Sequence, residues 1–220
     1  MKRILLFGAG KSATTLIQFI ADYCQKKNHE FIVCDNDLLL AESKIKGFKT
    51  SRALSLDVNN DNERQSAISS ADLVISLLPP SLHIRVAKDC VLFYKNLLTA
   101  SYVDEQLQNL SEEIERRGIL FISEMGLDPG IDHMSAMHII DTLKSRGAKI
   151  QSFYSHCGGL VAPESDDNPW HYKITWNPRN VVMAGNAGAR YLENGKEKHI
   201  GYHEVFSFDN QNIELQETGL

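Results

Sequence analysis

The sequence predicts an α/β protein in which a doubly wound parallel sheet is followed by the start of a second α/β or α+β domain. Three observations predict this fold class. Short apolar runs alternate with helical patterns over residues 1–123, a glycine-rich loop follows the first run, and the pattern changes after Glu124. Continuous apolar strands are typical of a parallel sheet that helices cover on both faces. We therefore expect one complete domain over residues 1–123 and the N-terminal part of another over residues 124–220.

Each expected strand is a short apolar run bounded by turn-forming residues. These runs are Ile4–Phe7, Phe31–Cys34, Ser51–Val58, Leu73–Leu78, Asn96–Ala100 and Ile119–Ile122. Each expected helix is an amphipathic or polar segment between two runs. These segments are Ser12–Lys26, Asp37–Lys46, Asn59–Ser70, Ser81–Phe93 and Asp104–Arg117. Asp37 can accept hydrogen bonds from the amides of a first turn, while Gly47 and the pair Pro79-Pro80 end a helix and a strand.

The pattern after the sixth expected strand is different. Leu127–Asp132 predicts a loop that leads into a helix ending near Ser145, and Lys149–His156 alternates in the manner of a strand. The dipeptide Asn194-Gly195 predicts a hairpin. Roughly 95 residues are few for a whole substrate domain, so this region looks like the beginning of a larger, truncated one.

Composition excludes several classes of protein. A 43% share of hydrophobic residues is ordinary for a folded chain and too high for a disordered one. The net charge is −5 and no Lys/Arg cluster is present, so no nucleic-acid partner is expected. No run of about 18 apolar residues could span a membrane, so no membrane partner is expected either. The four scattered cysteines, Cys24, Cys34, Cys90 and Cys157, favour a reducing cytoplasm.

A Gly-x-Gly-x-x-Ala loop stands between the first strand and the first helix. Its first glycine permits a tight turn, its second lets a pyrophosphate approach the backbone, and its small alanine lets helix and strand pack closely. The amides at the helix start then face the phosphates. The residues predicted to hold a dinucleotide here are Gly8, Gly10, Lys11, Ser12 and Ala13. The first domain is therefore expected to be a dinucleotide-binding Rossmann domain, with an empty loop of the same fold as the alternative.

Asp35 ends the second expected strand and would accept hydrogen bonds from the adenosine ribose hydroxyls. A 2′-phosphate would be repelled by this carboxylate, and no arginine follows to offset the repulsion. The expected cofactor is therefore NAD, with NADP less favoured. Asp57 and Val58, at the end of the third expected strand, are also assigned to the cofactor site.

The ends of two later strands should lie on the edge of the sheet where such folds bind ligands. The cofactor contacts predicted there are Ser76, Leu77, Leu78, Pro79 and Ala100. Strand termination explains the prolines equally well. Ser101 and Tyr102 offer hydroxyls near the reacting carbon, although Ser101 could instead cap the helix that starts near Asp104.

Asp128 is the third candidate on this edge, with capping of the helix that starts near Gly130 as its alternative. The spacing of the acidic and histidine residues that follow does not suit a metal, so none is predicted. Cys157 has no evident base and is better placed as a small, polarisable wall of a substrate pocket than as a nucleophile. Trp170 and Lys173 lie in an aromatic stretch, where the lysine could hold a substrate carboxylate.

Taken in order, these motifs resemble the L-glutamate-forming saccharopine dehydrogenase family. The matching segments are Gly8–Gly10, Ser76–Pro80, Thr99–Tyr102, Glu124–Met134, Cys157–Glu164, Asn168–Pro169 and Tyr172–Arg179. The most specific of them are Gly-Leu-Asp-Pro-Gly-Ile-Asp-His and Cys-Gly-Gly. The likeness covers essentially the whole chain, but members of the family are much longer.

The resemblance implies hydride transfer from the secondary amine of saccharopine to a nicotinamide. Water then splits the resulting imine into L-glutamate and 2-aminoadipate 6-semialdehyde. It also points to Ser101, Tyr102 and Asp128 as pocket residues beside the nicotinamide, with Cys157 nearby. We therefore predict catalytic roles for Tyr102, Asp128 and Cys157. The predicted substrate contacts are Ser101, Tyr102 and Asp128, together with Trp170 and Lys173 from the aromatic stretch. Two alternatives remain: a dehydrogenase of a polyamine precursor, of the carboxynorspermidine type, and a dinucleotide-binding module without catalysis. Exposed apolar surface on a truncated second domain would favour a homodimer.

Overall fold

The computed structural model describes residues 1–156, 161–174, 183, 185–186, 188–205 and 207. The chain divides into two compact units, Met1–Tyr172 and Lys173–Leu220, which we describe separately. Among the described residues, no helix has both the length and the apolar character needed to cross a membrane. The expected domain boundary near residue 124 stays a prediction.

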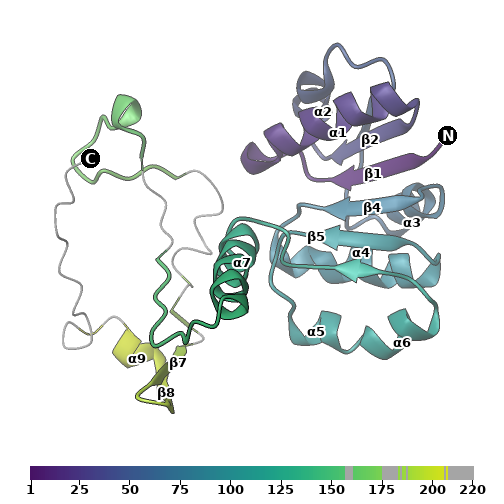
Figure 1. Ribbon diagram of the computed structural model, residues 1–220. Coiled ribbons are helices and arrows are strands. Elements are labelled where there is room, and N and C mark those ends of the chain that lie inside the picture. The colour runs from purple at the N-terminus through teal and green to yellow at the C-terminus, as the bar shows by residue number, and fades with distance from the viewer. Residues whose placement is uncertain (157–160, 175–182, 184, 187, 206, 208–220) are drawn as a thin grey trace. The chain divides into compact units, whose positions relative to one another are not determined.

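Six parallel strands form the sheet of the first unit, in the order β3-β2-β1-β4-β5-β6 (Figure 1). The strands are β1 Arg3–Phe7, β2 Glu30–Asp35, β3 Ser51–Ser55, β4 Leu73–Ser76, β5 Asn96–Thr99 and β6 Phe121–Ile122. The chain runs outward from β1 on one side and resumes at β4 on the other, which is the doubly wound arrangement. The predicted fold class is confirmed.

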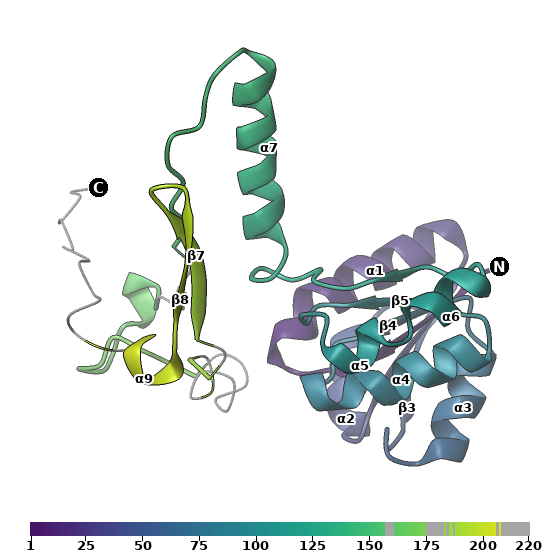
Figure 2. The ribbon, with the colours of Figure 1, turned by 90° about the horizontal axis from the view of Figure 1, so that it is seen from below.

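Helices cover both faces of this sheet, as Figure 2 shows for α1 and α4. The helices of the sheet domain are α1 Thr14–Lys27, α2 Leu38–Ile45, α3 Asp61–Ser69, α4 Pro80–Leu92, α5 Glu105–Gln108 and α6 Ser111–Arg116. On one face, Ile17 and Ile20 of α1 pack on Leu6 and Val33. The opposite core includes the buried side chains of Leu5, Val74, Ile68, Val86 and Leu97. Side chains alternate along each strand, so β1 to β5 each contribute to both cores, whereas β6 contributes Phe121 to one.

The sequence predicted one helix over 104–117, and the structure has two short ones. The Leu110 amide donates to the carbonyl of Leu107, three residues back, at 3.0 Å. This tighter turn separates α5 from α6.

The strand register aligns the carboxyl ends of the central strands. Phe7 pairs with both Cys34 and Ser76, and Ser76 pairs with Thr99. The loops that follow β1, β4 and β5 therefore leave the sheet side by side. We call this the carboxyl edge, and the predicted site residues of the first 102 positions lie along it.

Beyond the sheet, α7 spans Ile131–Ser145, as expected, and a short 3₁₀ turn covers Pro163–Ser165. The predicted strand at 149–156 is wrong, because these described residues form no strand. A strand needs a neighbour to bond its backbone, and Phe153 and Tyr154 are 55% and 80% exposed.

The second unit contains the predicted hairpin, formed by β7 Ala189–Glu193 and β8 Lys196–Ile200. Asn194 and Gly195 have φ values of 51° and 74°, which a two-residue hairpin turn of this type requires. A short helix, α9, follows at Tyr202–Val205.

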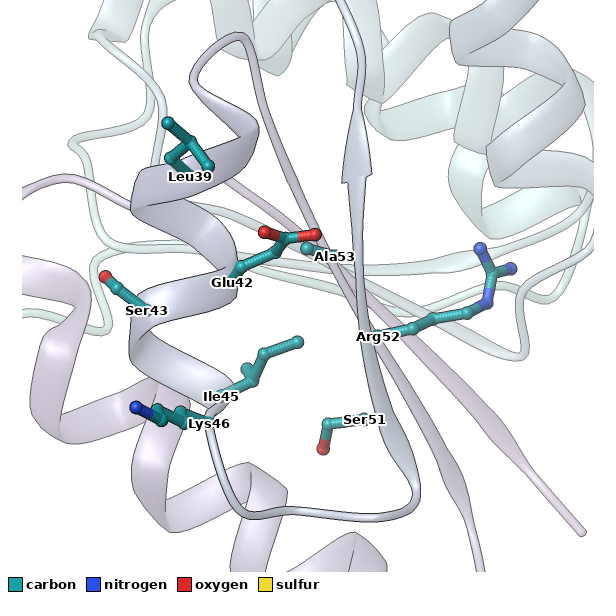
Figure 3. Close-up of a pocket in the computed structure, with 8 residues that line it drawn as sticks. All are labelled: Leu39, Glu42, Ser43, Ile45, Lys46, Ser51, Arg52 and Ala53. Atoms are coloured by element: carbon teal, nitrogen blue, oxygen red, sulfur yellow. The ribbon is translucent and has the colours of Figure 1, made fainter.

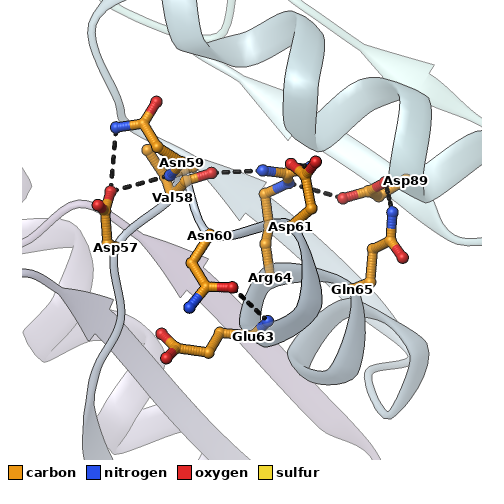
Figure 4. Close-up of polar contacts among 9 residues, drawn as sticks. All are labelled: Asp57, Val58, Asn59, Asn60, Asp61, Glu63, Arg64, Gln65 and Asp89. Atoms are coloured by element: carbon orange, nitrogen blue, oxygen red, sulfur yellow. Dashed lines mark hydrogen bonds and ion pairs between the residues drawn. The ribbon is translucent and has the colours of Figure 1, made fainter.

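A buried ion pair ties the loop after β3 to two helices (Figure 4). Arg64 of α3 donates to Asp89 of α4 at 2.6 Å, and both residues are 4% exposed. The same guanidinium donates to the carbonyl of Val58, and Gln65 donates to the second oxygen of Asp89 at 3.0 Å. These bonds hold the Val58 backbone in place at the carboxyl edge.

Replacing Asp89→Asn leaves the buried Arg64 charge with Asp61 as its carboxylate partner at 2.8 Å, and Asp61 is 65% exposed and screened by solvent. We expect the free energy of unfolding, measured by urea denaturation, to fall by about 3–5 kcal/mol. The control is Arg116→Gln, which removes an exposed pair with Glu113 and should leave the midpoint unchanged. A loss of under about 1 kcal/mol in Asp89→Asn would contradict this account.

Candidate active site

The glycine-rich loop after β1 closely approaches the loop after β4. Gly8 has a φ of 99°, and a Cβ atom placed on it would lie 2.9 Å from the carbonyl oxygen of Leu77. Only glycine fits this position without displacing the neighbouring backbone. By contrast, a Cβ on Gly10 would meet nothing within 4 Å, so the loop is open on that side.

Gly10 precedes a 3₁₀ turn over Lys11–Ala13, which leads directly into α1. No side chain caps this start, and Lys11 and Ser12 are exposed while Ala13 is buried against the core. Uncapped amides beside open space fit a dinucleotide diphosphate. The loop therefore has the geometry that the sequence predicted, and its role in binding stays a prediction.

Asp35 braces the loop from the end of β2. One of its carboxylate oxygens accepts from the Ala9 amide at 2.7 Å, and the other accepts from the Asp37 amide at 3.0 Å. Lys44 of α2 lies close by, donating to the Gly10 carbonyl at 2.5 Å and to Thr14 Oγ1 at 2.8 Å. Burial lowers the pKa of Lys44, and the negative charge of Asp35 opposes that shift.

Asp57 and Val58 follow β3 at the same edge. The Leu56 amide donates to the Asp35 carbonyl at 3.1 Å, which continues the pairing of β3 with β2. Asp57 is exposed and accepts from the amide of Asn59, whereas Val58 is buried. Only the Asp57 side chain of this pair is open to solvent.

A line of three polar side chains crosses from β4 to the loop after β5. Ser76 Oγ lies 2.8 Å from His83 Nδ1, and His83 Nε2 lies 2.8 Å from Ser101 Oγ. Ser76 is fully buried, His83 is 2% exposed, and Ser101 is partly exposed at the edge. Sequence reasoning missed His83, because nothing in its own segment indicates that its ring bonds one residue at the end of β4 and another just after β5. Its place one turn into the helix that follows β4 was the only signal.

The other residues after β4 and β5 are at the edge as predicted. Leu77, Leu78 and Ala100 are partly exposed, and Pro79 is exposed at the start of α4. Ser101 does not cap the next helix, since Asp104 fills that position and accepts from the Leu107 amide at 2.8 Å.

Burial dominates the chemistry of His83. Removal from water lowers the pKa of its imidazole from 6.5 to about 4, with a small opposing effect from the negative charge of Asp104. The ring is therefore neutral at neutral pH and offers one donor and one acceptor nitrogen.

Tyr102 and Asp128 form a hydrogen-bonded pair at the carboxyl edge. The Tyr102 hydroxyl donates to Asp128 Oδ1 at 2.8 Å. Burial, followed by the hydrogen bond to Asp128, raises the pKa of Tyr102 to about 12. The tyrosine is therefore a hydrogen-bond donor at neutral pH, and Asp128 is not the cap of α7.

The loop over 124–130 holds Asp128 in place by backbone contacts. The amides of Glu124 and Met125 donate to the carbonyls of Ser101 and Thr99 at 3.0 and 3.1 Å. At the far end of the loop, a Cβ on Gly130 would lie 2.1 Å from the Gly126 carbonyl oxygen, so only glycine fits there.

One acidic cluster lies beside this loop. Ligand atoms of Asp128, Asp132 and His133 all lie within 4.8 Å of one another. Local bonds account for the arrangement, because Asp132 Oδ1 accepts from the Gly130 amide at 3.1 Å and contacts His133 Nδ1 at 2.6 Å. We assign no metal to it.

The remaining predicted residues lie elsewhere in the chain. Trp170 is 83% exposed and donates its amide to Asn168 Oδ1. Lys173 begins the second unit, and Cys157 lies outside the described residues, so both assignments stay predictions. A surface hollow between α2 and β3, lined by Leu39, Glu42 and Arg52 among others, contains no predicted site residue (Figure 3).

Comparison with known proteins identifies the family. Residues 4–122 match the model described as the saccharopine dehydrogenase NADP binding domain, and residues 126–220 match that of the saccharopine dehydrogenase C-terminal domain. The chain belongs to the saccharopine dehydrogenase family. The predicted resemblance is therefore confirmed.

Relatives within the saccharopine dehydrogenase family are similar over most of this chain. An NADP(+), L-glutamate-forming saccharopine dehydrogenase from Schizosaccharomyces pombe is 38% identical, over 89% of this chain and 43% of the relative. An alpha-aminoadipic semialdehyde synthase from Arabidopsis thaliana is 41% identical, over 83% and 17%. The solved structure of an apo, histidine-tagged saccharopine dehydrogenase (L-Glu forming) from Saccharomyces cerevisiae matches with a TM-score of 0.79 and 36% identity, over 93% of this chain and 45% of that chain. The chain thus spans less than half the length of these relatives.

The predicted preference for NAD is wrong. The matching family model is an NADP binding domain, and the curated relatives from both yeasts are named for NADP(+). The prediction treated Asp35 as an open carboxylate, but both of its oxygens already accept backbone amides. In addition, Lys44 of α2 brings a positive charge to the loop from well beyond Asp35 in the sequence, where the local motif gave no signal.

The buried neutral ring of His83 makes stability depend on pH. Its pKa is lower in the folded state than in the unfolded state, so its contribution is present above about pH 6.5 and is lost as the pH falls toward about 4. Between pH 7 and pH 5 we expect the wild type to lose about 2 kcal/mol more stability than His83→Gln. Urea unfolding of both proteins at the two pH values measures the difference. Equal losses would mean that His83 titrates normally in the folded protein.

Proposed function

We propose that this chain carries the coenzyme site and part of the substrate site of an NADP-dependent saccharopine dehydrogenase, an oxidoreductase of lysine metabolism. The reaction interconverts saccharopine, NADP+ and water with L-glutamate, 2-aminoadipate 6-semialdehyde, NADPH and a proton. One observation carries the proposal: the open glycine loop and the Tyr102–Asp128 pair lie on one carboxyl edge. Hydride transfer from an amine needs both a site for the coenzyme diphosphate and a carboxylate beside the substrate nitrogen, where positive charge develops.

The loop and its neighbours supply the coenzyme half of the site. The uncapped amides after Gly10 attract the diphosphate, and the Lys11 and Lys44 ammonium groups add positive charge at the same end. Lys44 has three N–H donors and uses two of them on Gly10 and Thr14. Its remaining donor and its charge favour a coenzyme with an extra phosphate. A bound nicotinamide coenzyme supplies the hydride acceptor in the direction of saccharopine oxidation.

Asp128 supplies the substrate half. When the amine carbon loses a hydride and its nitrogen becomes an iminium, a positive charge develops on the substrate. A fixed carboxylate beside that nitrogen stabilises the charge as it forms. Tyr102 holds the carboxylate in one orientation through its hydroxyl. Water then adds to the electrophilic iminium carbon. Cleavage of the C–N bond releases L-glutamate as the amine and the semialdehyde as the carbonyl product, and one proton passes to solvent.

The reducing cytoplasm remains our proposal for the compartment. The described cysteines Cys24, Cys34 and Cys90 are free and buried, which supports that proposal.

The decisive experiment compares Asp128→Asn with the wild type in the protein that carries this chain. We expect kcat for saccharopine oxidation to fall by about 100-fold, because the amide lacks the charge that stabilises the iminium. The dissociation constant for NADP+, measured by calorimetry, should change less than about twofold. The matched control is Asp141→Asn, an exposed acidic residue on α7.

Two results would contradict the proposal. An unchanged kcat in Asp128→Asn would remove its assigned role. NADP+ binding without any turnover of saccharopine by the wild type would favour a binding module without catalysis.

A further inference from the structure

The line Ser76–His83–Ser101 has no role in the function proposed above, although it ends at the same edge. Its inner end, at Ser76, is closed to solvent. Ser76 is fully buried, and Thr99, which pairs with it across the β4–β5 register, is 2% exposed. The Thr99 hydroxyl has no hydrogen-bond partner in the described part of the chain. Only Ser101, at the outer end, reaches the surface.

Because its inner end is closed, the line does not conduct protons. A general base must pass its proton on to solvent or to another titratable group. No such group contacts Ser76 among the described residues, since its only side-chain partner is His83. The histidine therefore orients its neighbours and does not relay protons.

The closed inner end also determines the direction of the two hydrogen bonds of His83. A buried hydroxyl that accepts a bond still needs an acceptor for its own proton, and an unsatisfied buried donor is costly. Among the residues that the structure describes, the only side-chain acceptor that bonds Ser76 is His83 Nδ1, at 2.8 Å. Ser76 therefore donates to Nδ1. Because a neutral imidazole carries one proton, that proton lies on Nε2 and is donated to Ser101 Oγ.

We propose that His83 is a positioning residue that holds the Ser101 hydroxyl as an outward-facing hydrogen-bond donor for a carboxylate of the substrate. Ser101 Oγ accepts from His83, so its own O–H is left for a ligand. An outward donor selects an acceptor, and the carboxylates of an amino-acid substrate are the strongest acceptors that the proposed reaction brings to this edge. This inference rests on the proposed function, and it adds the group that Ser101 recognises.

The direction of the bonds is tested without any turnover. In ¹⁵N NMR spectra of histidine-labelled protein at pH 7, the signals lost in His83→Gln identify the ring. We expect the Nε2–H tautomer, with an unprotonated Nδ1. Ser76→Ala should weaken that preference, because it removes the donor that holds Nδ1. An Nδ1–H tautomer, or a charged ring at pH 7, would overturn the proposal.

The role of the line is tested by kinetics. His83→Asn keeps an amide near Ser76 but is too short to reach Ser101, so we expect kcat/KM for saccharopine to fall by about 10- to 100-fold. His83→Gln places an amide donor near the original Nε2 position and should recover most of that loss. The control His138→Asn changes an exposed histidine of α7 and should have no effect.

A double-mutant cycle separates positioning from general disruption of the core. His83→Asn should cost nothing further in a Ser101→Ala background, since its effect passes through that hydroxyl. Additive losses would show that His83 is only a core residue. Weaker NADP+ binding in His83→Asn with kcat/KM unchanged would assign Ser101 to the coenzyme instead of the substrate. If the wild type does not turn over saccharopine, the proposed function fails, and the NMR result still decides the direction of the bonds.

Discussion

The close approach of the Gly8 and Leu77 backbones is the constraint on which the site depends. Parallel pairing of β1 with β4 brings the two strand ends together. A Cβ atom on Gly8 would lie 2.9 Å from the Leu77 carbonyl oxygen, so there is no room for a side chain. This approach sets where the loop opens toward a diphosphate on one side. On the other side it fixes Ser76, from which the line through His83 reaches Ser101.

The width of the sheet explains how one edge can serve both halves of the proposed reaction. Neighbouring strands lie about 4.8 Å apart, so the glycine loop after β1 and the hydroxyls after β5 are separated by roughly two strand spacings. A dinucleotide laid across the strand ends spans such a distance, with its diphosphate at the loop and its reactive ring near β4 and β5. Positive charge gathers at Lys11 and Lys44 beside the loop, and negative charge at Asp128 beyond β5. The edge is therefore polarised in the sense that an anionic coenzyme and a developing iminium cation require.

The sequence predicted most of the fold, because its strands are continuous apolar runs and its glycine loop occurs in the right context. It failed where the structure depends on partners far along the chain. The alternation at 149–156 predicted a strand, but this segment pairs with no other strand among the described residues. Asp35 was recognised as an acid at the right strand end, but its bonds to the Ala9 and Asp37 amides follow from the folded loop. His83 carried no local signal for the same reason. Asp128 and Tyr102 were predicted separately, and their direct contact became evident only from the loop that joins them.

The central claim is that the carboxyl edge of this sheet binds the coenzyme. The most direct test is a titration of the ¹⁵N-labelled chain with NADP+, followed by amide chemical shifts. The account predicts that the largest shifts fall on Gly10, Lys11, Ser12, Leu78 and Ala100. Shifts confined to the hollow between α2 and β3, with these amides unmoved, would contradict it.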